Sequence, residues 1–178
     1  YANLKEYDKA AKYYEERARR AGWAEEVYYS LFQIGLMQYH LKNMNNAIMQ
    51  LNEAYSYRPI RFEALHMLGV IYREQKKYHF ARLLQEEVLN MKYPDSDKLF
   101  IHNTNQRYGA DFELAICYYW MGEYKKAEMH ALKVQKMGGI PQSISKQNEE
   151  NIKFIYEKLK IQKTGKNDII YVSMFTAK

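Results

Sequence analysis

Apolar residues recur along most of this chain with the period of an amphipathic helix. Near the C-terminus, for example, Ile152, Ile155 and Leu159 are spaced by three and four residues, which places them on one helical face. The pattern predicts eight helices, at residues 7–20, 24–41, 44–57, 60–75, 78–91, 107–121, 124–137 and 144–161. Only three Pro and eight Gly interrupt the chain, so we expect a folded, all-α protein.

Small residues mark a repeat within this pattern. A Gly or Ala in a first helix precedes an Ala in the next helix by 12 residues in three pairs, which are Gly35 with Ala47, Gly69 with Ala81, and Ala115 with Ala127. The first two pairs are 34 residues apart. Antiparallel helices approach each other most closely where their side chains are smallest, so these positions predict helix crossings.

A 34-residue period with small residues at these offsets resembles the tetratricopeptide repeat. The resemblance implies an all-α, right-handed α-solenoid of about three and a half helix pairs plus a closing helix. Repeats would occupy residues 1–143, with an inserted segment near 95–107, because Ala81 and Ala127 are 46 residues apart. Tyr7 and Ala10 match positions of a second helix, so the half pair stands at the N-terminus.

The C-terminal part of the chain departs from the repeat. Residues 144–161 predict a capping helix whose polar outer face ends the stack. Gly165, Asn167 and Asp168 then predict a turn, and the sequence DIIYVSMF that follows is a short β-prone run. Residues 162–178 are therefore either a linker or tail on the array or the start of a following domain. Because the first residue is Tyr1, we also expect this chain to be a piece of a longer protein.

Composition narrows the classes of function. The net charge is +6, but most basic residues are interspersed with acidic ones, as on a solvated surface, so we expect no nucleic-acid partner. The sequence has no apolar run of roughly 18 residues, so it predicts no membrane span. Cys117 is the single cysteine, which fits a reducing compartment, and we expect a cytoplasmic protein.

The aromatic run Tyr118-Tyr119-Trp120 raises the question of a binding surface. Tyr118 occupies a core position of the repeat, whereas Tyr119 and Trp120 lie about 100° and 200° further round the same helix. They would either pack against the closing helix or line the concave side of the array. The same reasoning nominates a concave groove on the first helices of the pairs, with Tyr29, Phe32, Gln33, Tyr39, His40, His66, Arg73, Phe112, Tyr119 and Trp120.

Patterns that could carry reaction chemistry are weak. Asp95-Ser96-Asp97 matches the acidic pattern with which many sugar-nucleotide transferases hold a metal, but it follows Pro94 in a turn, where Asp more often caps a helix. The histidines lack the spacing of a metal site, and Cys117 lies beside core positions, as a buried thiol would. We therefore expect no metal, no cofactor and no catalytic residue, and a chain that is not itself an enzyme.

Three stretches narrow the resemblance further: RAGWAEEVYYSLFQIG at 20–35, YPDSDKLFIHN at 93–103, and ADFELAICYYWMGEYKKA at 110–127. Together they resemble the tetratricopeptide region attached to family-2-type glycosyltransferases, in which a GT-A catalytic domain is fused to a helical array. The resemblance implies that the catalytic domain lies outside these residues. The array would then position a glycan acceptor, a partner protein or a neighbouring catalytic domain.

Two functions follow as hypotheses. The first is a non-catalytic scaffold of a larger glycosyltransferase. The alternative is a free-standing adaptor that binds a peptide or helix of a partner protein in its concave groove. A truncated end of a solenoid could also pair with a second copy, so self-association is a further possibility.

Overall fold

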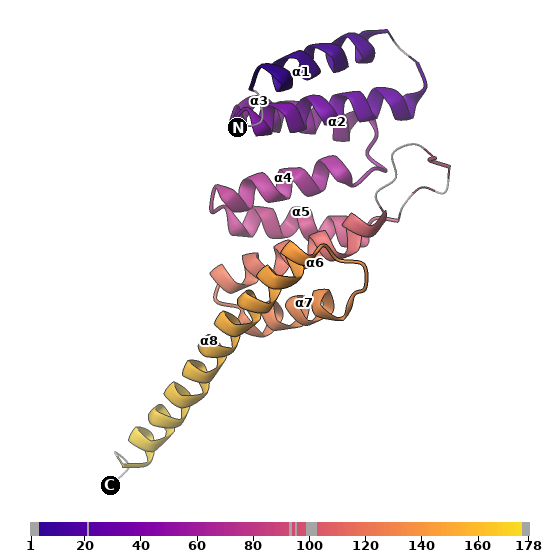
Figure 1. Cartoon of the computed structure of the whole chain (residues 1–178). Coiled ribbons are helices and arrows are strands. Elements are labelled where there is room, and N and C mark those ends of the chain that lie inside the picture. The colour runs from indigo at the N-terminus through magenta and orange to yellow at the C-terminus, as the bar shows by residue number, and fades with distance from the viewer. Residues whose placement is uncertain (1–3, 21, 93, 95, 99–102, 176–178) are drawn as a thin grey trace.

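A computed structural model describes residues 4–20, 22–92, 94, 96–98 and 103–175 of the chain (Figure 1). The described residues form helices and no strands, which confirms the all-α prediction. The helices are α1 (Leu4–Arg19), α2 (Ala24–His40), α3 (Met44–Tyr57), α4 (Glu63–Glu74), α5 (Tyr78–Asn90), α6 (Asn103–Trp120), α7 (Tyr124–Lys136) and α8 (Gln142–Phe175). Most of these bounds agree within about two residues with those predicted from the sequence.

The helices stack as antiparallel pairs (Figure 1). Helices α2 and α3, α4 and α5, and α6 and α7 form the three pairs, and α1 packs on α2 as the second helix of a half pair. Figure 1 shows the tight turns within the pairs along one edge of the array and the longer connections along the other. Successive first helices, α4 and α6, also touch each other, so the array has one face made of first helices.

The turns within the three pairs share one backbone geometry. Lys42, Lys76 and Gly122 occupy equivalent positions and have φ values of 64°, 60° and 78°. In each turn the following backbone N–H donates to a carbonyl five residues earlier, with N–O distances of 2.9 Å in all three. This is the hydrogen-bonding pattern of a helix that ends in a left-handed residue. The backbone closes these turns, so their side chains are free to differ.

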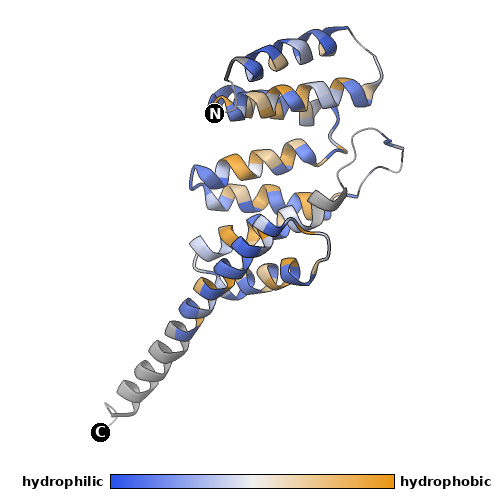
Figure 2. Ribbon diagram, in the orientation of Figure 1, coloured by the Kyte–Doolittle hydropathy of each residue, from blue (hydrophilic) through white to orange (hydrophobic). Residues whose placement is uncertain are grey.

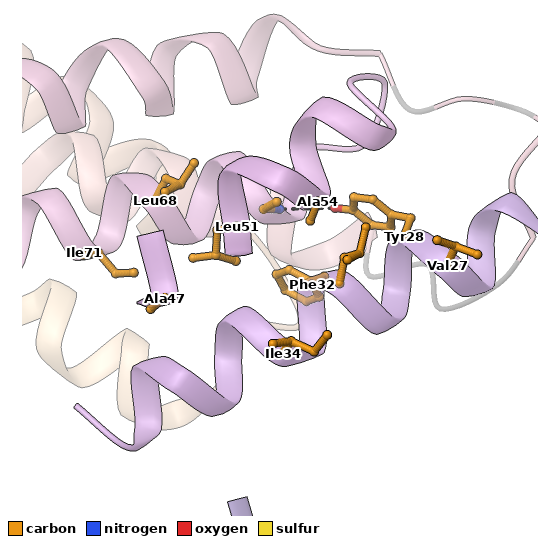
Figure 3. Close-up of a cluster of buried hydrophobic side chains, with 11 residues drawn as sticks. Val27, Tyr28, Phe32, Ile34, Ala47, Leu51, Ala54, Leu68 and Ile71 are labelled. Carbon is orange, nitrogen blue, oxygen red and sulfur yellow. Dashed lines mark hydrogen bonds between the residues drawn. The ribbon is translucent and has the colours of Figure 1, made fainter. Parts of the chain in front are cut away.

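The core lies between the helices of each pair and between neighbouring pairs (Figure 3). Tyr28, Leu51 and Ile71 are fully buried in the largest cluster, which joins α2, α3 and α4. A second cluster joins α6, α7 and α8, and a smaller one joins α4, α5 and α6. Figure 2 shows that apolar and polar residues alternate along the helices of the array. Each pair therefore buries its apolar face on its neighbours, as a solenoid requires.

The structure refines the prediction about the small residues. Ala47, Ala81 and Ala127 are fully buried, as helix crossings require. A Cβ at Gly35 would lie 2.7 Å from Leu51 Cγ, and one at Gly69 would lie 2.3 Å from Gln85 Nε2. The glycines thus make room for a large residue 16 positions later, and not for the alanine 12 positions later that the sequence had suggested. In the third pair the equivalent positions hold Ala115 and Ala131, both buried in one cluster.

The start of α4 differs from its predicted position at residue 60. Residues 58–61 form a turn in which the Arg61 N–H donates to the Arg58 carbonyl oxygen (N–O 3.0 Å), and the helix begins only at Glu63. This turn directs the Arg61 side chain into a buried cluster of charged groups described below. The inserted segment is shorter than predicted, because α6 already begins at Asn103.

The prediction of a turn and a β-prone run after residue 161 is wrong. Helix α8 is a single helix of 34 residues, whose N-terminal part packs on α7 and α6 and whose C-terminal part projects from the array (Figure 1). A glycine such as Gly165 costs a helix only about 1 kcal/mol and removes no hydrogen bond, whereas the chain has no proline after Pro141 to break the helix. The assignment of residues 162–178 to a linker or tail, or to the start of a following domain, stays a prediction.

Candidate functional site

A pocket of about 320 Å³ opens on the face made by the first helices. Phe32, Gln33 and Leu36 come from α2; Phe62, Glu63, His66 and Met67 come from the start of α4; Tyr108 and Gly109 come from α6. Because residues three and four apart lie on the same side of a helix, α2 and α4 each present several neighbouring side chains to this space, whereas α6 contributes the Tyr108 side chain and the backbone of Gly109. Three of the residues predicted for the groove, Phe32, Gln33 and His66, are thus brought together in one pocket.

The His66 ring is held in place by neighbours on both sides. Its Nδ1 atom lies 2.8 Å from Gln85 Oε1, and Gln85 Nε2 donates to the His66 carbonyl oxygen at 3.0 Å. The ring also packs against Gly109, where an added Cβ would lie 3.0 Å from His66 Cε1. Gln85 is fully buried and fits only because Gly69 has no side chain. The orientation of the histidine therefore depends on two glycines.

A row of polar side chains runs beside this pocket across the same three helices. Tyr39 Oη on α2 donates to Glu74 Oε1 on α4 at 2.8 Å. The neighbouring Arg73 forms an ion pair with Glu113 on α6. Burial, followed by the hydrogen bond to Glu74, raises the pKa of Tyr39 to about 12, so its hydroxyl stays a donor at neutral pH. These contacts tie α2, α4 and α6 together and fix the spacing of the face.

A second pocket of about 330 Å³ lies between α6 and α8. It is mainly apolar and is lined by Ala115, Ile116, Tyr119, Trp120, Asn151, Phe154 and Ile155. Trp120 is 62% exposed, and its ring stacks on Tyr78 of α5 with centroids 5.9 Å apart. Tyr118 is buried, and its hydroxyl donates to Glu86. The aromatic run therefore divides: Tyr118 belongs to the core, while Tyr119 and Trp120 border this pocket.

The remaining predicted groove residues lie elsewhere. Tyr29 packs edge-on against Tyr14 of α1, with ring centroids 6.2 Å apart. His40 is stacked on Tyr7 of α1 at 5.1 Å. Phe112 is buried in α6. Tyr29 and His40 therefore face α1. Helix α1 packs on the side of α2 that would contact the preceding repeat in a longer array.

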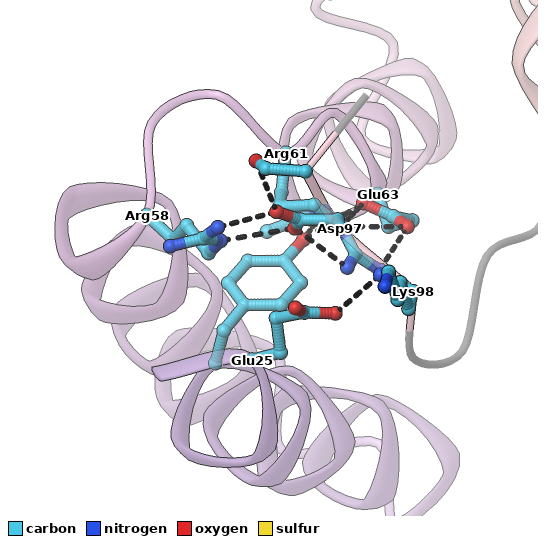
Figure 4. Close-up of polar contacts among 9 residues, drawn as sticks. Glu25, Arg58, Arg61, Glu63, Asp97 and Lys98 are labelled. Atoms are coloured by element: carbon cyan, nitrogen blue, oxygen red, sulfur yellow. Dashed lines mark hydrogen bonds and ion pairs between the residues drawn. The ribbon is translucent and has the colours of Figure 1, made fainter. Parts of the chain in front are cut away.

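Sequence reasoning missed a buried cluster of charged groups between the α3–α4 turn and the inserted segment (Figure 4). Arg61 is 1% exposed, and its guanidinium lies 2.6 Å from Glu63 Oε1 and 3.1 Å from Asp97 Oδ2. Arg58 donates to the same Asp97 carboxylate from the other side, at 3.0 Å through Nε. Asp97 therefore does not cap a helix or face solvent as a metal ligand would, because its carboxylate is taken by two arginines.

Three further contacts connect this cluster to α2. Tyr28 Oη donates to Glu63 Oε2 at 3.1 Å, and the Arg61 guanidinium lies over the Tyr28 ring, 4.9 Å from its centroid. The backbone N–H of Lys98 donates to Glu25 Oε2 at 2.8 Å. The inserted segment is thus fastened to the array at Asp97 and Lys98. No local sequence pattern predicts this cluster, because the contacts of Asp97 with Arg58 and Arg61 and that of Lys98 with Glu25 join residues 36 or more positions apart.

Asp97 gives the fold a testable acid sensitivity. Hydrogen bonds from Arg58 and then Arg61 lower the pKa of Asp97 below its ordinary value, although burial acts in the opposite direction. A carboxylate with a lowered folded-state pKa stabilises the fold above its unfolded pKa of about 3.9, and this contribution is lost as the pH falls further. We expect the difference in free energy of unfolding between the wild type and Asp97→Asn to shrink below about pH 4. Denaturant unfolding at several pH values measures it, and a difference independent of pH would contradict the assignment.

Other reactive side chains are buried or paired. Cys117 is fully buried, and burial raises the pKa of its thiol to about 12, so it carries little thiolate at neutral pH. His130 Nδ1 lies 2.6 Å from Asp111 Oδ1 in the interior between α6 and α7. Among the described residues, no three His, Cys, Asp or Glu side chains are grouped as a metal site would need. In the same part of the chain, no helix is both long and apolar enough to cross a membrane.

Comparison with known proteins identifies the class of fold. Neither the known protein families nor the curated proteins give a match. Among solved structures, the chain is similar to a MamA RS-1 ArsTM double mutant, with a TM-score of 0.53, 16% sequence identity, and coverage of 86% of this chain and 96% of that chain. MamA is a tetratricopeptide-repeat protein, and at this identity the likeness shows the fold alone. The chain is therefore an α-solenoid of the tetratricopeptide type, as predicted. The association with glycosyltransferases stays a prediction.

Proposed function

We propose that this chain is a non-catalytic scaffold that binds a segment of a partner protein on the face formed by α2, α4 and α6. The observation that carries the proposal is the pocket shared by these three helices, which is apolar at Phe32, Leu36 and Met67. Apolar pockets with a few convergent polar groups are the usual form of a binding site. The polar row from Tyr39 to Glu113 beside it offers hydrogen-bonding groups to an extended or helical peptide.

A random 12-residue peptide library, panned on the immobilised chain, tests this proposal. Selected peptides are synthesised, and their affinity for wild type and variants is measured by fluorescence anisotropy. We expect Met67→Glu to weaken binding at least about tenfold, because a carboxylate placed in an apolar pocket must lose water when a ligand covers it. Thermal unfolding checks that the variant is folded.

Met49→Glu is the matched control. Met49 is 57% exposed on α3, a second helix, so the same change there should leave peptide binding unaltered. The proposal fails if Met67→Glu binds the selected peptides as tightly as the wild type, or if Met49→Glu weakens them equally.

A finer hypothesis places the array in a larger glycosyltransferase, where it would position a glycan acceptor, a partner protein or a neighbouring catalytic domain. Its support is the resemblance of residues 20–35, 93–103 and 110–127 to such arrays. The gene sequence on either side of these 178 residues tests it, because a GT-A domain should be encoded there. Its absence would favour the free-standing adaptor. Turnover of sugar nucleotides by the isolated chain with a divalent metal would contradict the non-catalytic role.

A further inference from the structure

The pocket shared by α2, α4 and α6 contains the His66 ring, and the hydrogen-bonding role of each ring nitrogen follows from its neighbours. Gln85 Nε2 donates to the His66 carbonyl oxygen, which fixes the orientation of the amide and leaves Oε1 as an acceptor. Since His66 Nδ1 lies 2.8 Å from that Oε1, Nδ1 must carry a proton and donate it. In the neutral ring the other nitrogen, Nε2, is then an acceptor. No described residue hydrogen-bonds to Nε2.

The walls around this acceptor are mostly apolar and partly aromatic. Phe32 and Phe62 contribute rings, and Met67 contributes a thioether, a group that makes favourable contacts with aromatic rings. The charged residue among the lining residues is Glu63, whose carboxylate also accepts hydrogen bonds and whose charge is balanced by Arg61. The pocket of about 320 Å³ is at the lower end of ligand sites, which range over roughly 300–1,000 Å³. It suits one large side chain.

We propose that this pocket receives an aromatic side chain with a hydrogen-bond donor, tryptophan or tyrosine, from the partner segment, and that His66 Nε2 accepts the N–H or O–H. This inference rests on the proposed function and adds to it the chemistry of the ligand. Aromatic side chains with a polar tip satisfy both features, since the ring fills the apolar space and the tip pairs with the acceptor. Gln85 is a positioning residue, because it acts only by holding the histidine proton on Nδ1.

The first measurement needs no variant. Long-range proton–nitrogen NMR spectra of the histidine-labelled chain at neutral pH should show His66 protonated on Nδ1 and unprotonated on Nε2. A ring protonated on Nε2 would overturn the proposal. In Gln85→Leu we expect the preference for the Nδ1 tautomer to be lost.

The second measurement uses small probes in place of a partner. We expect N-acetyl-tryptophanamide to shift the backbone resonances around the pocket and to bind about tenfold more tightly than its 1-methylindole analogue, which lacks the donor. N-acetyl-tyrosinamide and its O-methyl ether form the second arm. A factor of ten is the size of effect expected when an acceptor in a partly buried site loses its donor. Equal binding by a donor and its methylated analogue, in both arms, would overturn the proposal.

His66→Phe keeps a ring in the pocket but removes the acceptor, so the ratio between each probe and its methylated analogue should fall to about one. The matched control is His79→Phe, since His79 is exposed on α5 and should leave the ratio unchanged. A ratio that persists in His66→Phe would contradict the role of Nε2. Selected peptides that contain neither tryptophan nor tyrosine provide a further test. If they bind the wild type and bind Met67→Glu more weakly, the proposed scaffold function is supported but the proposed aromatic ligand is contradicted.

Discussion

Replacing Arg61 by methionine should destabilise the fold by about 3–5 kcal/mol, the usual cost of breaking a buried ion pair by removing one partner. The Arg61 side chain is 2% exposed and holds both Glu63 and Asp97. Without it the two carboxylates would be left buried beside each other, with Arg58 and Ser96 still donating to Asp97 and Tyr28 to Glu63. Methionine fills a similar volume, so the loss would reflect charge and hydrogen bonding more than packing. Urea unfolding followed by circular dichroism measures the change.

Arg20→Met provides the control for this experiment. Arg20 pairs with Glu16 at 3.7 Å, but both side chains are 70% exposed, and exposed pairs contribute about 0–1 kcal/mol. The control should therefore unfold almost as the wild type does. A loss for Arg61→Met as small as that for Arg20→Met would mean that the charged cluster contributes little to holding the inserted segment.

Gly35→Ala is expected to destabilise the fold by about 1–3 kcal/mol, as overpacking of a core does. The new Cβ would lie 2.7 Å from Leu51 Cγ, and Leu51 is fully buried, so the two helices would have to move apart. Alanine favours a helix over glycine by about 1 kcal/mol, so a net loss would show that the close approach outweighs propensity. The midpoint of thermal unfolding reports the sign directly.

Two companion variants sharpen this test. Gly138→Ala has nothing within 4 Å of the new Cβ and should change stability by less than about 0.5 kcal/mol. The double variant Gly35→Ala/Leu51→Ala reproduces the Ala115 and Ala131 arrangement of the third pair. It should lose less stability than the sum of the two single variants, because each change accommodates the other. Simple additivity would contradict the proposed contact.

Most of the fold could be predicted because each repeat has a recognisable local sequence pattern. Helical periodicity and the small residues at 35, 47, 69, 81, 115 and 127 gave the pairs and their order. Errors arise where contacts distant in sequence decide the structure. The start of α4 is one example, because it is set by Arg61, which turns inward to reach Asp97. The error in the length of α8 has a local cause instead, since one glycine is too weak a breaker to end a helix.

The candidate site could be predicted only in part. Phe32, Gln33 and His66 were found because they share one side of the first helices. Phe62 and Tyr108 were missed, since they lie at or near helix starts whose position depends on the turn and the insertion. Gln85 was missed for a different reason. It lies on the second helix of its pair and reaches His66 through the space left by the missing side chain of Gly69. A polar residue 16 positions after a glycine, where the first pair has Leu51, is the signal that could have found it.

The three left-handed turns at Lys42, Lys76 and Gly122 have a practical consequence. The hydrogen bonds that close each turn five residues back join main-chain atoms, and the turns lie along one edge of the array (Figure 1). Fluorophores or affinity handles attached to exposed side chains in these turns, such as Lys76, would therefore leave the packing of the helices and the pocket of α2, α4 and α6 unchanged. A label in each of these turns would report on one helix pair, so the order in which successive pairs unfold could be followed separately.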